Sequence, residues 1–506
     1  MNSSVSVQDL IADVPNARII GFQSVRVYGV QYDSRRIEPG DLFAALRGGA
    51  ADGHDYLKQA ILRGASALLV ELPFSAPPEG VAQIVVRNSR VALAPIAASF
   101  FGQPSHQIPI IGITGTDGKT TTSYLLSAIF RAAGLVAGLI STVAIRIGDD
   151  VTHDANRQTT PESVDVQRYL REMVGQGVNW AIVESTSHGL AQHRLDCTRF
   201  SIGAVTNITH EHLEFHKTID AYRRAKAILL ERVGAVRGTI VINADDDGAK
   251  SIEKYAVGAS ILRYSASGAS AEFRAHDVRM GPKVSCFNLK SPAGNIAIEL
   301  PLVGEFNIAN ALCAIAIASV AGVGLEDIAQ GLALAPAVPG RMARIDAGQP
   351  FTVVVDYAHT PESLSKVLTL LRRLHSGGRL VVVSGSAGER DKTKRPLQGK
   401  VCAELADFSV FTSEDPRNED PDEIISQIAD GARLAGSREV EDYARITDRG
   451  KAIAFALGMA CAGDCVLLAG KGHEQSIIWA GEYRPWDDAS AAHTALLELG
   501  FSADPL

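Results

Sequence analysis

The segment Gly112-Ile-Thr-Gly-Thr-Asp-Gly-Lys-Thr-Thr-Thr122 continues an apolar run that begins at Ile108, and a helical pattern follows it from Thr120 to about Ala133. A strand, a glycine-rich turn and a helix N-terminus in this order direct backbone N–H groups toward a bound phosphate. Within the turn, Lys119 would reach the β- and γ-phosphates of a nucleotide, and Thr120 could bind Mg²⁺.

The turn departs from the strict P-loop pattern, which would place glycine where this chain has Ile113. We therefore interpret Gly115-Thr-Asp-Gly-Lys-Thr120 as a variant P-loop, with a plain strand-to-helix turn as the less favoured alternative. A P-loop alone leaves a kinase, a motor, a GTPase and a ligase open.

Apolar runs on both sides of this segment predict an α/β protein with three domains. Strands that alternate with helices form parallel βαβ units, and a strand buried on both faces is continuously apolar. We expect a small N-terminal α/β domain over residues 1–107, a central P-loop domain with a mainly parallel sheet over 108–338, and a C-terminal Rossmann-like α/β domain over 339–506. The predicted strands are residues 67–71, 83–87, 108–113, 180–184, 202–206, 238–243, 351–356, 379–384, 408–412 and 464–469. Residues 55–64 have a helical pattern, and residues 102–107 form a predicted linker.

The bulk composition excludes several classes of protein. The length of 506 residues is too great for one hydrophobic core. A net charge of −8 argues against a nucleic-acid-binding protein, because such proteins need a basic surface. The six scattered cysteines indicate reduced interior thiols. The most apolar stretch, residues 311–325, is shorter than the roughly twenty residues of a membrane span, and the N-terminus lacks the pattern of a signal peptide. We expect a cytoplasmic protein with no membrane segment, and a monomer.

Two further segments carry polar groups that could serve chemistry. Glu184 ends a predicted strand, where doubly wound sheets bind ligands, so it fits a magnesium ligand as well as it fits a surface glutamate. His212 and His216 have the i, i+4 spacing of zinc ligands on a helix. The zinc hypothesis is weak, because Glu214 prevents the His-Glu-x-x-His pattern of metalloproteases.

Together these segments resemble the Mur ligases, and among them the MurE-type enzymes that add the third residue to UDP-N-acetylmuramoyl-L-alanyl-D-glutamate. The resemblance extends over nearly the whole chain. It rests on Asp33-Ser-Arg35, Asp52-Gly-His54, Gly115-Thr-Asp-Gly-Lys-Thr120, Thr159-Thr-Pro161, residues 184–190, residues 207–226, residues 304–310, Val338-Pro-Gly-Arg341, Asp356-Tyr-Ala-His-Thr360, Arg390-Asp391, Asp415-Pro-Arg417 and Gly470-Lys-Gly-His-Glu474.

The resemblance implies the residues of an ATP and Mg²⁺ site. Lys119, Glu184, His212 and Lys226 would be catalytic. Lys226 would react with CO₂ to become a carbamate, which turns a cation into an oxygen ligand, and it would bind Mg²⁺ with Thr120, Glu184 and His212. The ATP ligands would be Gly115, Thr116, Asp117, Gly118, Lys119, Thr120 and Thr121 of the P-loop, with Asn307, Arg341, Asp356 and His359.

The same resemblance implies two substrates, a UDP-N-acetylmuramoyl-dipeptide and a free diamino acid. Ser34 and Arg35 would bind the uridine end of the first substrate. Its muramoyl-peptide part would contact Thr159, Thr160, Ser187, Gln192 and Arg194. The amino acid would be bound by Arg390, Asp415, Arg417, Gly470 and Glu474.

The implied reaction is that of an ATP-dependent acid–amino-acid ligase. The substrate carboxylate attacks the γ-phosphate, and an amine then attacks the acyl-phosphate to give an amide, ADP and phosphate. Alternatives are another ligase on the same scaffold, such as a folylpolyglutamate synthetase-like enzyme or another Mur ligase, a nucleotide-binding paralogue without turnover, and a zinc hydrolase.

Two positions depart from the family pattern. Thr186 stands where serine is expected, which keeps the hydroxyl group. Glu414-Asp415 stands where diaminopimelate-adding enzymes carry Asp-Asn. The negative charge of Asp415 would suit the ammonium of L-lysine or L-ornithine better than the zwitterionic end of diaminopimelate, and the sequence leaves the choice among the three open.

Overall fold

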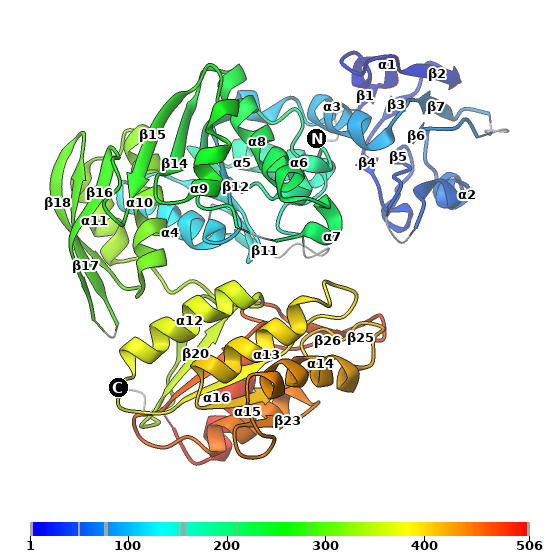
Figure 1. Ribbon diagram of the computed structural model, residues 1–506. Coiled ribbons are helices and arrows are strands. Elements are labelled where there is room, and N and C mark those ends of the chain that lie inside the picture. The colour runs from blue at the N-terminus through cyan, green and yellow to red at the C-terminus, as the bar shows by residue number, and fades with distance from the viewer. Residues whose placement is uncertain are drawn as a thin grey trace. The chain divides into compact units, whose positions relative to one another are not determined.

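The computed structural model describes residues 4–48, 51–74, 79–148, 150–152, 158–209, 211–281 and 283–502. Its contacts divide the chain into two compact units (Figure 1). The first unit holds residues 1–277, 287–298 and 308–334, and the second holds residues 278–286, 299–307 and 335–506. Three principal sheets, two in the first unit and one in the second, agree with the predicted three-domain α/β fold.

The N-terminal sheet has five strands in the order β2-β7-β6-β5-β4. They are β2 (Arg18–Gly21), β4 (Val30–Gln31), β5 (Leu42–Ala44), β6 (Ala67–Val70) and β7 (Ala82–Val85), beside a two-stranded pair β1 (Val5–Ser6) and β3 (Arg26–Val27). Strands β4 to β7 are parallel, and β2 is antiparallel to β7. The helices are α1 (Val7–Leu10), α2 (Leu57–Leu62) and α3 (Ser89–Phe100), with 3-10 turns at Ser34–Arg36, Gly53–Tyr56 and Pro104–His106. The helix predicted at residues 55–64 is therefore shorter and begins with a 3-10 turn, and the predicted linker contains another.

The central sheet has eleven strands in the order β11-β10-β9-β12-β8-β13-β14-β15-β16-β17-β18. Their bounds are β8 (Ile110–Thr114), β9 (Ala137–Ile140), β10 (Ile145–Ile147), β11 (Asp150–Thr152), β12 (Trp180–Glu184), β13 (Phe200–Val205), β14 (Thr239–Asn243), β15 (Ser260–Ser265), β16 (Phe273–Met280), β17 (Ser285–Ser291) and β18 (Gly294–Leu300). From β9 to β16 the neighbours are parallel, whereas β10 and β11 are antiparallel. These pairings confirm the predicted mainly parallel sheet. Its central strands are continuously apolar and are buried, as expected of strands covered on both faces.

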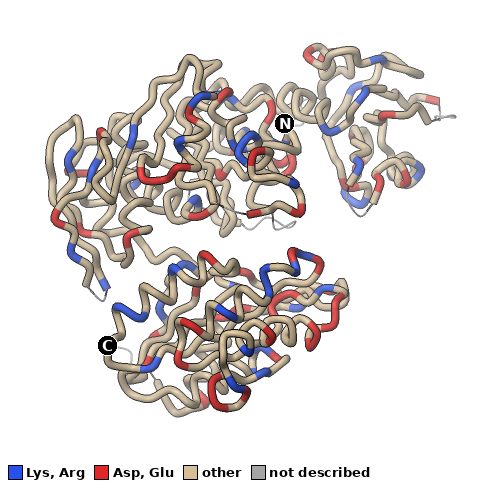
Figure 2. The backbone as a smooth tube through the Cα atoms, viewed as in Figure 1, with Lys and Arg blue, Asp and Glu red and all other residues tan. Residues whose placement is uncertain are grey.

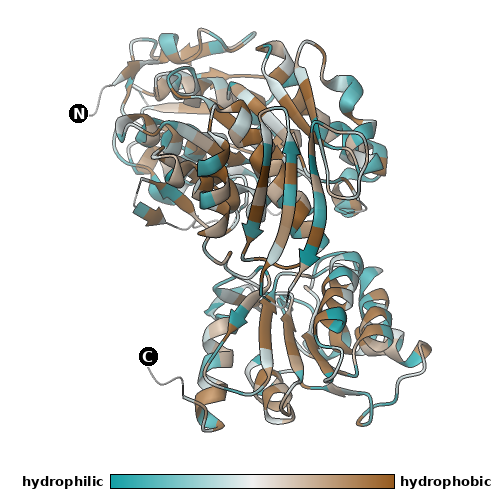
Figure 3. Ribbon diagram, turned by 90° about the vertical axis from the view of Figure 1, so that its left-hand side faces the viewer, coloured by the Kyte–Doolittle hydropathy of each residue, from teal (hydrophilic) through white to brown (hydrophobic). Residues whose placement is uncertain are grey.

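Strands β15 to β18 extend this sheet beyond the predicted strands. β17 alternates buried and exposed residues along its length. Figure 3, in which this side of the molecule faces the viewer, shows the same alternation of hydrophobic and hydrophilic segments. A strand with one solvated face lacks the continuous apolar run by which the other strands were predicted.

The central helices are α4 (Lys119–Ala132), α5 (Ser163–Gly175), α6 (Ser187–Ala191), α7 (Leu213–His216), α8 (Ile219–Ala235), α9 (Asp247–Ser251), α10 (Glu305–Val320) and α11 (Leu325–Ala333), with a 3-10 turn at Glu253–Tyr255. Helix α8 packs its Leu229 and Val233 against Phe200 and Ile240 of the sheet. The apolar stretch at residues 311–325 lies mostly in α10. In the part of the chain that the structure describes, no helix combines the length and the hydropathy needed to cross a membrane.

The C-terminal sheet has six strands in the order β19-β20-β24-β21-β22-β23. The strands are β19 (Ala343–Ile345), β20 (Thr352–Asp356), β21 (Leu380–Ser384), β22 (Phe408–Phe411), β23 (Tyr443–Arg445) and β24 (Cys465–Ala469), with a hairpin of β25 (Ser476–Trp479) and β26 (Glu482–Pro485). The helices are α12 (Pro361–Leu374), α13 (Lys394–Leu405), α14 (Pro421–Leu434), α15 (Arg449–Gly458) and α16 (Asp488–Glu498). All strands from β20 to β23 are parallel, and β19 is antiparallel.

Alternate residues of the C-terminal strands enter two separate cores. Val354 and Val382 pack in the cluster that contains α12 and α14, whereas Val353 and Val381 pack in the cluster that contains α15 and α16. Because successive side chains of a strand point to opposite faces, helices must cover both sides of this sheet. This arrangement is the predicted Rossmann-like layering.

The prediction of interior cysteines is only half right. All six cysteines are free thiols, but Cys197, Cys286 and Cys461 are exposed.

Charged residues of both signs are interspersed along the described backbone (Figure 2).

Candidate active site

The P-loop connects the end of β8 to the start of α4. Gly115 has φ 152°, and a Cβ atom there would lie 1.8 Å from the Thr206 hydroxyl oxygen, so the loop needs glycine at this position. Asn207, just after β13, fixes the loop from the side. Its carbonyl oxygen accepts from the Thr116 amide at 2.7 Å, and its side-chain oxygen accepts from the Asp117 amide at 2.9 Å.

The first turn of α4 supplies the polar side chains of the loop. The Lys119 Nζ donates to the carbonyl oxygens of Gly115 and Thr116, both at 2.8 Å. Gly118 has φ 83°, and a Cβ atom there would meet the Asn310 side chain. Thr120 and Thr121 are buried. The lysine is thus held over the loop, where it would meet a phosphate.

Glu184 ends β12 beside the P-loop, on the neighbouring strand. The alternative of a surface glutamate is wrong, because the residue is fully buried. Its Oε2 accepts from the Thr120 hydroxyl at 3.1 Å and from the Thr142 hydroxyl at 2.9 Å. A buried carboxylate and a hydroxyl at this spacing are the hard oxygen donors that suit Mg²⁺.

Lys226 lies on α8 and is 1% exposed. Its Nζ donates to the Gly115 carbonyl at 2.7 Å and lies 4.5 Å from the centre of the Tyr222 ring. Burial, and then the nearby ammonium of Lys119, lower the pKa of Lys226 well below its usual value. The side chain is therefore biased toward the neutral amine, the form that can react with CO₂. Tyr222 in turn contacts the Thr116 hydroxyl at 2.9 Å.

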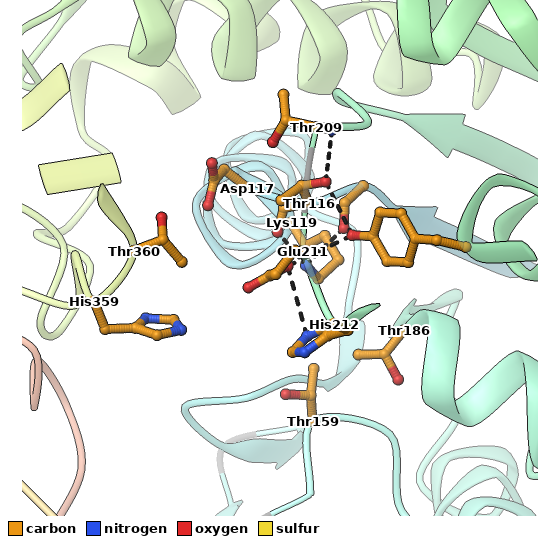
Figure 4. A network of polar contacts seen from close by, with 12 residues as sticks. Thr116, Asp117, Lys119, Thr159, Thr186, Thr209, Glu211, His212, His359 and Thr360 are labelled. Carbon is orange, nitrogen blue, oxygen red and sulfur yellow. Dashed lines mark hydrogen bonds and ion pairs between the residues drawn. The ribbon is translucent and has the colours of Figure 1, made fainter. Parts of the chain in front are cut away.

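His212 occupies the N-cap position of the short helix α7 in a left-handed conformation, φ 56°, and its side chain makes no capping hydrogen bond. Its ring nitrogens lie 3.5 Å from a carboxylate oxygen of Glu211 and 3.5 Å from one of Glu214, and its ring centre lies 4.7 Å from that of His188. Figure 4 shows Glu211 and His212 beside Thr116 and Lys119. Burial lowers the pKa of His188 to about 3 and that of His216 to about 4.

The zinc hypothesis gains no support from these histidines. Within the described ranges, from which His210 is missing, no group of three or more His, Cys, Asp or Glu side chains is arranged to hold a metal ion. Mg²⁺ differs from zinc in that it keeps several waters and substrate oxygens as ligands, so it does not need such a group.

The residues predicted to contact the muramoyl-peptide gather at the same end of the sheet. The Thr159 hydroxyl oxygen lies 2.9 Å from the Thr142 hydroxyl oxygen. The Thr160 hydroxyl donates to the Glu184 carbonyl at 2.7 Å and lies 2.9 Å from the Thr186 hydroxyl. Thr186 accepts from the Gly189 amide as the N-cap of α6, so the change from serine keeps the cap.

Arg194 is held by two hydrogen bonds and one ion pair. Its guanidinium donates to the Thr160 carbonyl at 2.9 Å and to the Gln192 side chain at 2.6 Å, and its Nε lies 3.1 Å from Glu162. Glu162 also binds Arg90 at 2.9 Å. Ser187 is buried in the first turn of α6. Four of the predicted residues, Thr159, Thr160, Gln192 and Arg194, are therefore linked in one polar network with Glu162, which was not predicted.

Ser34 and Arg35 lie in the first 3-10 turn of the N-terminal domain. The Ser34 hydroxyl donates to the Gln59 side chain at 2.8 Å, and Arg35 pairs with Asp33 at 2.8 Å. The guanidinium of Arg35 is 78% exposed, so it is accessible to a ligand.

The other predicted nucleotide ligands belong to the second unit. Asp356 ends β20, and its carboxylate accepts from the amides of Met342 and Ala358 at 2.7 and 2.8 Å. The Arg341 guanidinium lies 4.6 Å from the Tyr357 ring centre. His359 Nδ1 lies 2.9 Å from the Tyr357 carbonyl oxygen. Asn307 donates to the Val303 carbonyl at 2.8 Å.

Two of the residues predicted to bind the amino acid, Asp415 and Glu474, contact a buried lysine that was not predicted as a site residue. Lys471 has no exposed side-chain surface, and it donates to Asp415 at 2.8 Å and to Glu474. Burial raises the pKa of Glu474. Although burial opposes it, the carboxylates of Glu474 and Asp415 raise the pKa of the Lys471 ammonium. Asp415 therefore shares with Glu474 a positive charge that its place in the sequence does not reveal.

Three further residues are predicted to bind the amino acid. Arg417 adopts φ 55° and pairs through its backbone with the hairpin, by bonds to Ile478 and Ala480. Gly470 has φ 109°, and a Cβ atom there would lie 3.1 Å from a carboxylate oxygen of Glu414. Arg390 is exposed in the loop before α13.

Three family models match the chain in order. They are the Mur ligase family catalytic domain over residues 26–101, the Mur ligase middle domain over 113–318 and the Mur ligase glutamate ligase domain over 340–472. A UDP-N-acetylmuramyl-tripeptide synthetase of Roseiflexus sp. (strain RS-1) is 45% identical over 487 residues, which are 94% of this chain and 95% of the relative. The chain belongs to the Mur ligase family, and within it to the MurE type.

Other MurE-type proteins are nearly as similar. A UDP-N-acetylmuramoyl-L-alanyl-D-glutamate–2,6-diaminopimelate ligase of Bacillus licheniformis is 40% identical, over 95% of this chain and 96% of the relative. A solved structure of a ligase with the same name is 30% identical, with a TM-score of 0.67 over 99% of this chain and 100% of that chain. These relatives are ligases, so the zinc hydrolase and the paralogue without turnover lose their support.

Proposed function

We propose that this Mur ligase adds a diamino acid to UDP-N-acetylmuramoyl-L-alanyl-D-glutamate with the energy of ATP. One observation carries the proposal: the P-loop, the buried Glu184 and the buried amine of Lys226 meet at one place in a MurE-type chain. The reaction consumes ATP and a UDP-linked precursor, so we assign it to the cytoplasm.

The chain's own residues favour attack of the substrate carboxylate on the γ-phosphate. The Lys119 ammonium, held over the loop by two carbonyl oxygens, would turn toward the phosphates and neutralise the charge that spreads over the transferring group. Arg194 would orient the muramoyl-peptide from its fixed position beside Thr160. The products of this step are an acyl-phosphate and ADP. The incoming amine then attacks the acyl carbon and releases phosphate, which forms the amide.

Mg²⁺ would be held by the Thr120 hydroxyl and the Glu184 carboxylate, with His212 and the carbamate of Lys226 as the further ligands. When bound, it supplies positive charge to the phosphate oxygens. The burial of Lys226 and the lowered pKa of its amine support the carbamate, because CO₂ reacts with an unprotonated amine. The product of that reaction brings oxygen donors to the site.

The amino-acid site supports a substrate whose side chain ends in an ammonium, L-lysine or L-ornithine, in preference to meso-diaminopimelate. Asp415 and Glu474 share the single ammonium of Lys471, so these three side chains carry a net charge of −1 when both carboxylates are ionised. With asparagine at position 415, the positive charge of Lys471 and the negative charge of Glu474 would cancel. A substrate ammonium would restore that balance in a buried site, where uncompensated charge is costly.

Phosphate release by the purified protein tests the proposal. The assay contains ATP, Mg²⁺ and UDP-N-acetylmuramoyl-L-alanyl-D-glutamate, scanned over single amino acids, with the Lys119→Met variant as the control. Release that needs both the UDP-dipeptide and one diamino acid is the expected result. Release that ignores the UDP-dipeptide, or no release with any amino acid, would contradict it.

A further inference from the structure

Two loops of the second unit carry the residues assigned to the amino acid. Residues 385–393 lead from β21 into α13 and contain Arg390, and residues 412–420 lead from β22 into α14 and contain Asp415 and Arg417. The loops are in direct contact. The Gly388 amide donates to the Asp415 carbonyl at 2.8 Å, and the Asn418 side chain donates to Glu389 at 2.8 Å.

The two loops lie so close together that a larger side chain at their contact would force one of them to move. A Cβ atom on Gly388 would lie 2.0 Å from the Pro416 carbonyl oxygen. Glu389, next to Arg390, has φ 53°, a left-handed conformation that non-glycine residues adopt only when their surroundings hold them. The surroundings of this loop must therefore include a strong anchor.

Arg395 provides that anchor from the first turn of α13. Its side chain is fully buried, and it forms two parallel bonds to Glu419, at 3.0 and 3.1 Å. It also donates to the Ala387 carbonyl of one loop at 3.2 Å and to the Gln427 side chain of α14 at 2.8 Å. Glu419 in turn accepts from the Glu389 amide and pairs with Lys392 at 3.0 Å.

The helices behind the loops form a rigid support. Glycines let the backbones of α13 and α14 meet, since a Cβ atom on Gly399 or on Gly431 would lie 1.8 Å from a carbonyl oxygen of the other helix. Figure 1 shows α13 and α14 side by side. Arg395 thus joins both loops to a pair of closely packed helices.

We propose that Arg395, through Glu419, is a positioning residue that sets the spacing between Arg390 and Arg417 and so fixes the length of the amino acid that the enzyme accepts. The inference rests on the proposed function and assigns new roles to two residues outside its substrate contacts. Planar, bidentate pairing is what a guanidinium offers and an ammonium does not, so lysine at position 395 would keep the charge and lose the geometry.

The test compares Arg395→Lys with the wild-type protein in the ligation assay. We expect the KM for the preferred amino acid to rise on the order of tenfold, because a misplacement of about 1 Å is enough for such a loss. The KM values for ATP and the UDP-dipeptide should stay within about twofold, since none of the hydrogen bonds and ion pairs described for Arg395 and Glu419 reaches a residue assigned to those substrates. The preference for that amino acid over the homologue one methylene longer or shorter should shrink.

A second variant and a control keep the test decisive if Arg395→Lys is poorly folded. Glu419→Gln keeps the shape and removes the charge, and it should shift the same KM in the same direction. Arg379→Lys is the control, because Arg379 also contacts a carboxylate through two of its nitrogens, which lie 3.1 and 2.8 Å from one oxygen of Asp464, before the start of β21. It should leave the amino-acid KM unchanged.

The outcomes separate this inference from the proposed function. A wild-type protein without ligation overturns the proposed function and this inference with it. A wild-type protein that ligates, with Arg395→Lys and Glu419→Gln folded and unchanged in amino-acid KM and length preference, overturns the positioning role alone. An equal rise in all three KM values would show a structural role only and would also overturn it.

Discussion

The amine of Lys226 is buried against the P-loop carbonyl of Gly115, where an ammonium has poor solvation. If this amine is the site of carbamylation, Lys226→Ala should lower the ligation rate by about 100-fold or more, as the loss of one group that stabilises transition-state charge does. Short carboxylates or chloride should restore part of the rate by occupying the place of the carbamate. Full activity of the variant without additives would contradict the assignment.

The prediction that Asp415 favours an amino acid whose side chain ends in an ammonium is kept, but its physical reason now includes the pairing of Asp415 with Lys471. Asp415→Asn removes one of the two carboxylates that share Lys471, so the remaining charges of Lys471 and Glu474 can cancel. We expect the ratio of kcat/KM for L-lysine or L-ornithine over meso-diaminopimelate to fall. Steady-state kinetics with the three amino acids measures this ratio, and an unchanged ratio would remove the reason for preferring an ammonium-ended substrate.

At the scale of elements, the strands that surround the site could be predicted because they are buried on both faces. β12 has the bounds predicted for it, and β8, β13, β20 and β24 lie within two residues of theirs. The sequence could not show the pairs that join distant segments. Lys471 and Asp415 are 56 residues apart, and Arg395 and Glu419 are 24 apart, so only the folded sheet brings each pair together.

The P-loop between β8 and α4 needs glycine at position 115, and a substitution there tests the loop as a whole. Gly115→Ala places a methyl group against the Thr206 hydroxyl, so the loop must shift. We expect the variant to lose ATP binding and about 1–3 kcal/mol of unfolding free energy. Gly175→Ala in α5 is the control, because a Cβ atom there meets nothing within 4 Å. Calorimetric titration with Mg·ATP and denaturant unfolding measure the two effects, and normal ATP binding by Gly115→Ala would contradict the role of the loop.

At the scale of the whole molecule, each compact unit has hydrophobic cores of its own, the cluster around α8 in the first and the clusters on both faces of the C-terminal sheet in the second. Units with separate cores need not unfold together, so scanning calorimetry should resolve more than one transition. Mg·ATP should raise the transition of the first unit, which contains the P-loop, because a ligand at 100 times its Kd adds about 2.7 kcal/mol to the free energy of unfolding.

The Lys119→Met variant tests whether that calorimetric shift comes from nucleotide bound at the P-loop. The variant should keep both transitions in the absence of nucleotide, since Lys119 contacts only carbonyl oxygens of its own loop among the hydrogen bonds described for it. It should lose most of the shift with Mg·ATP, because the lysine is the cation closest to where the phosphates would bind. A single transition would contradict the independence of the units, whereas an undiminished shift in the variant would mean that the nucleotide binds away from the P-loop.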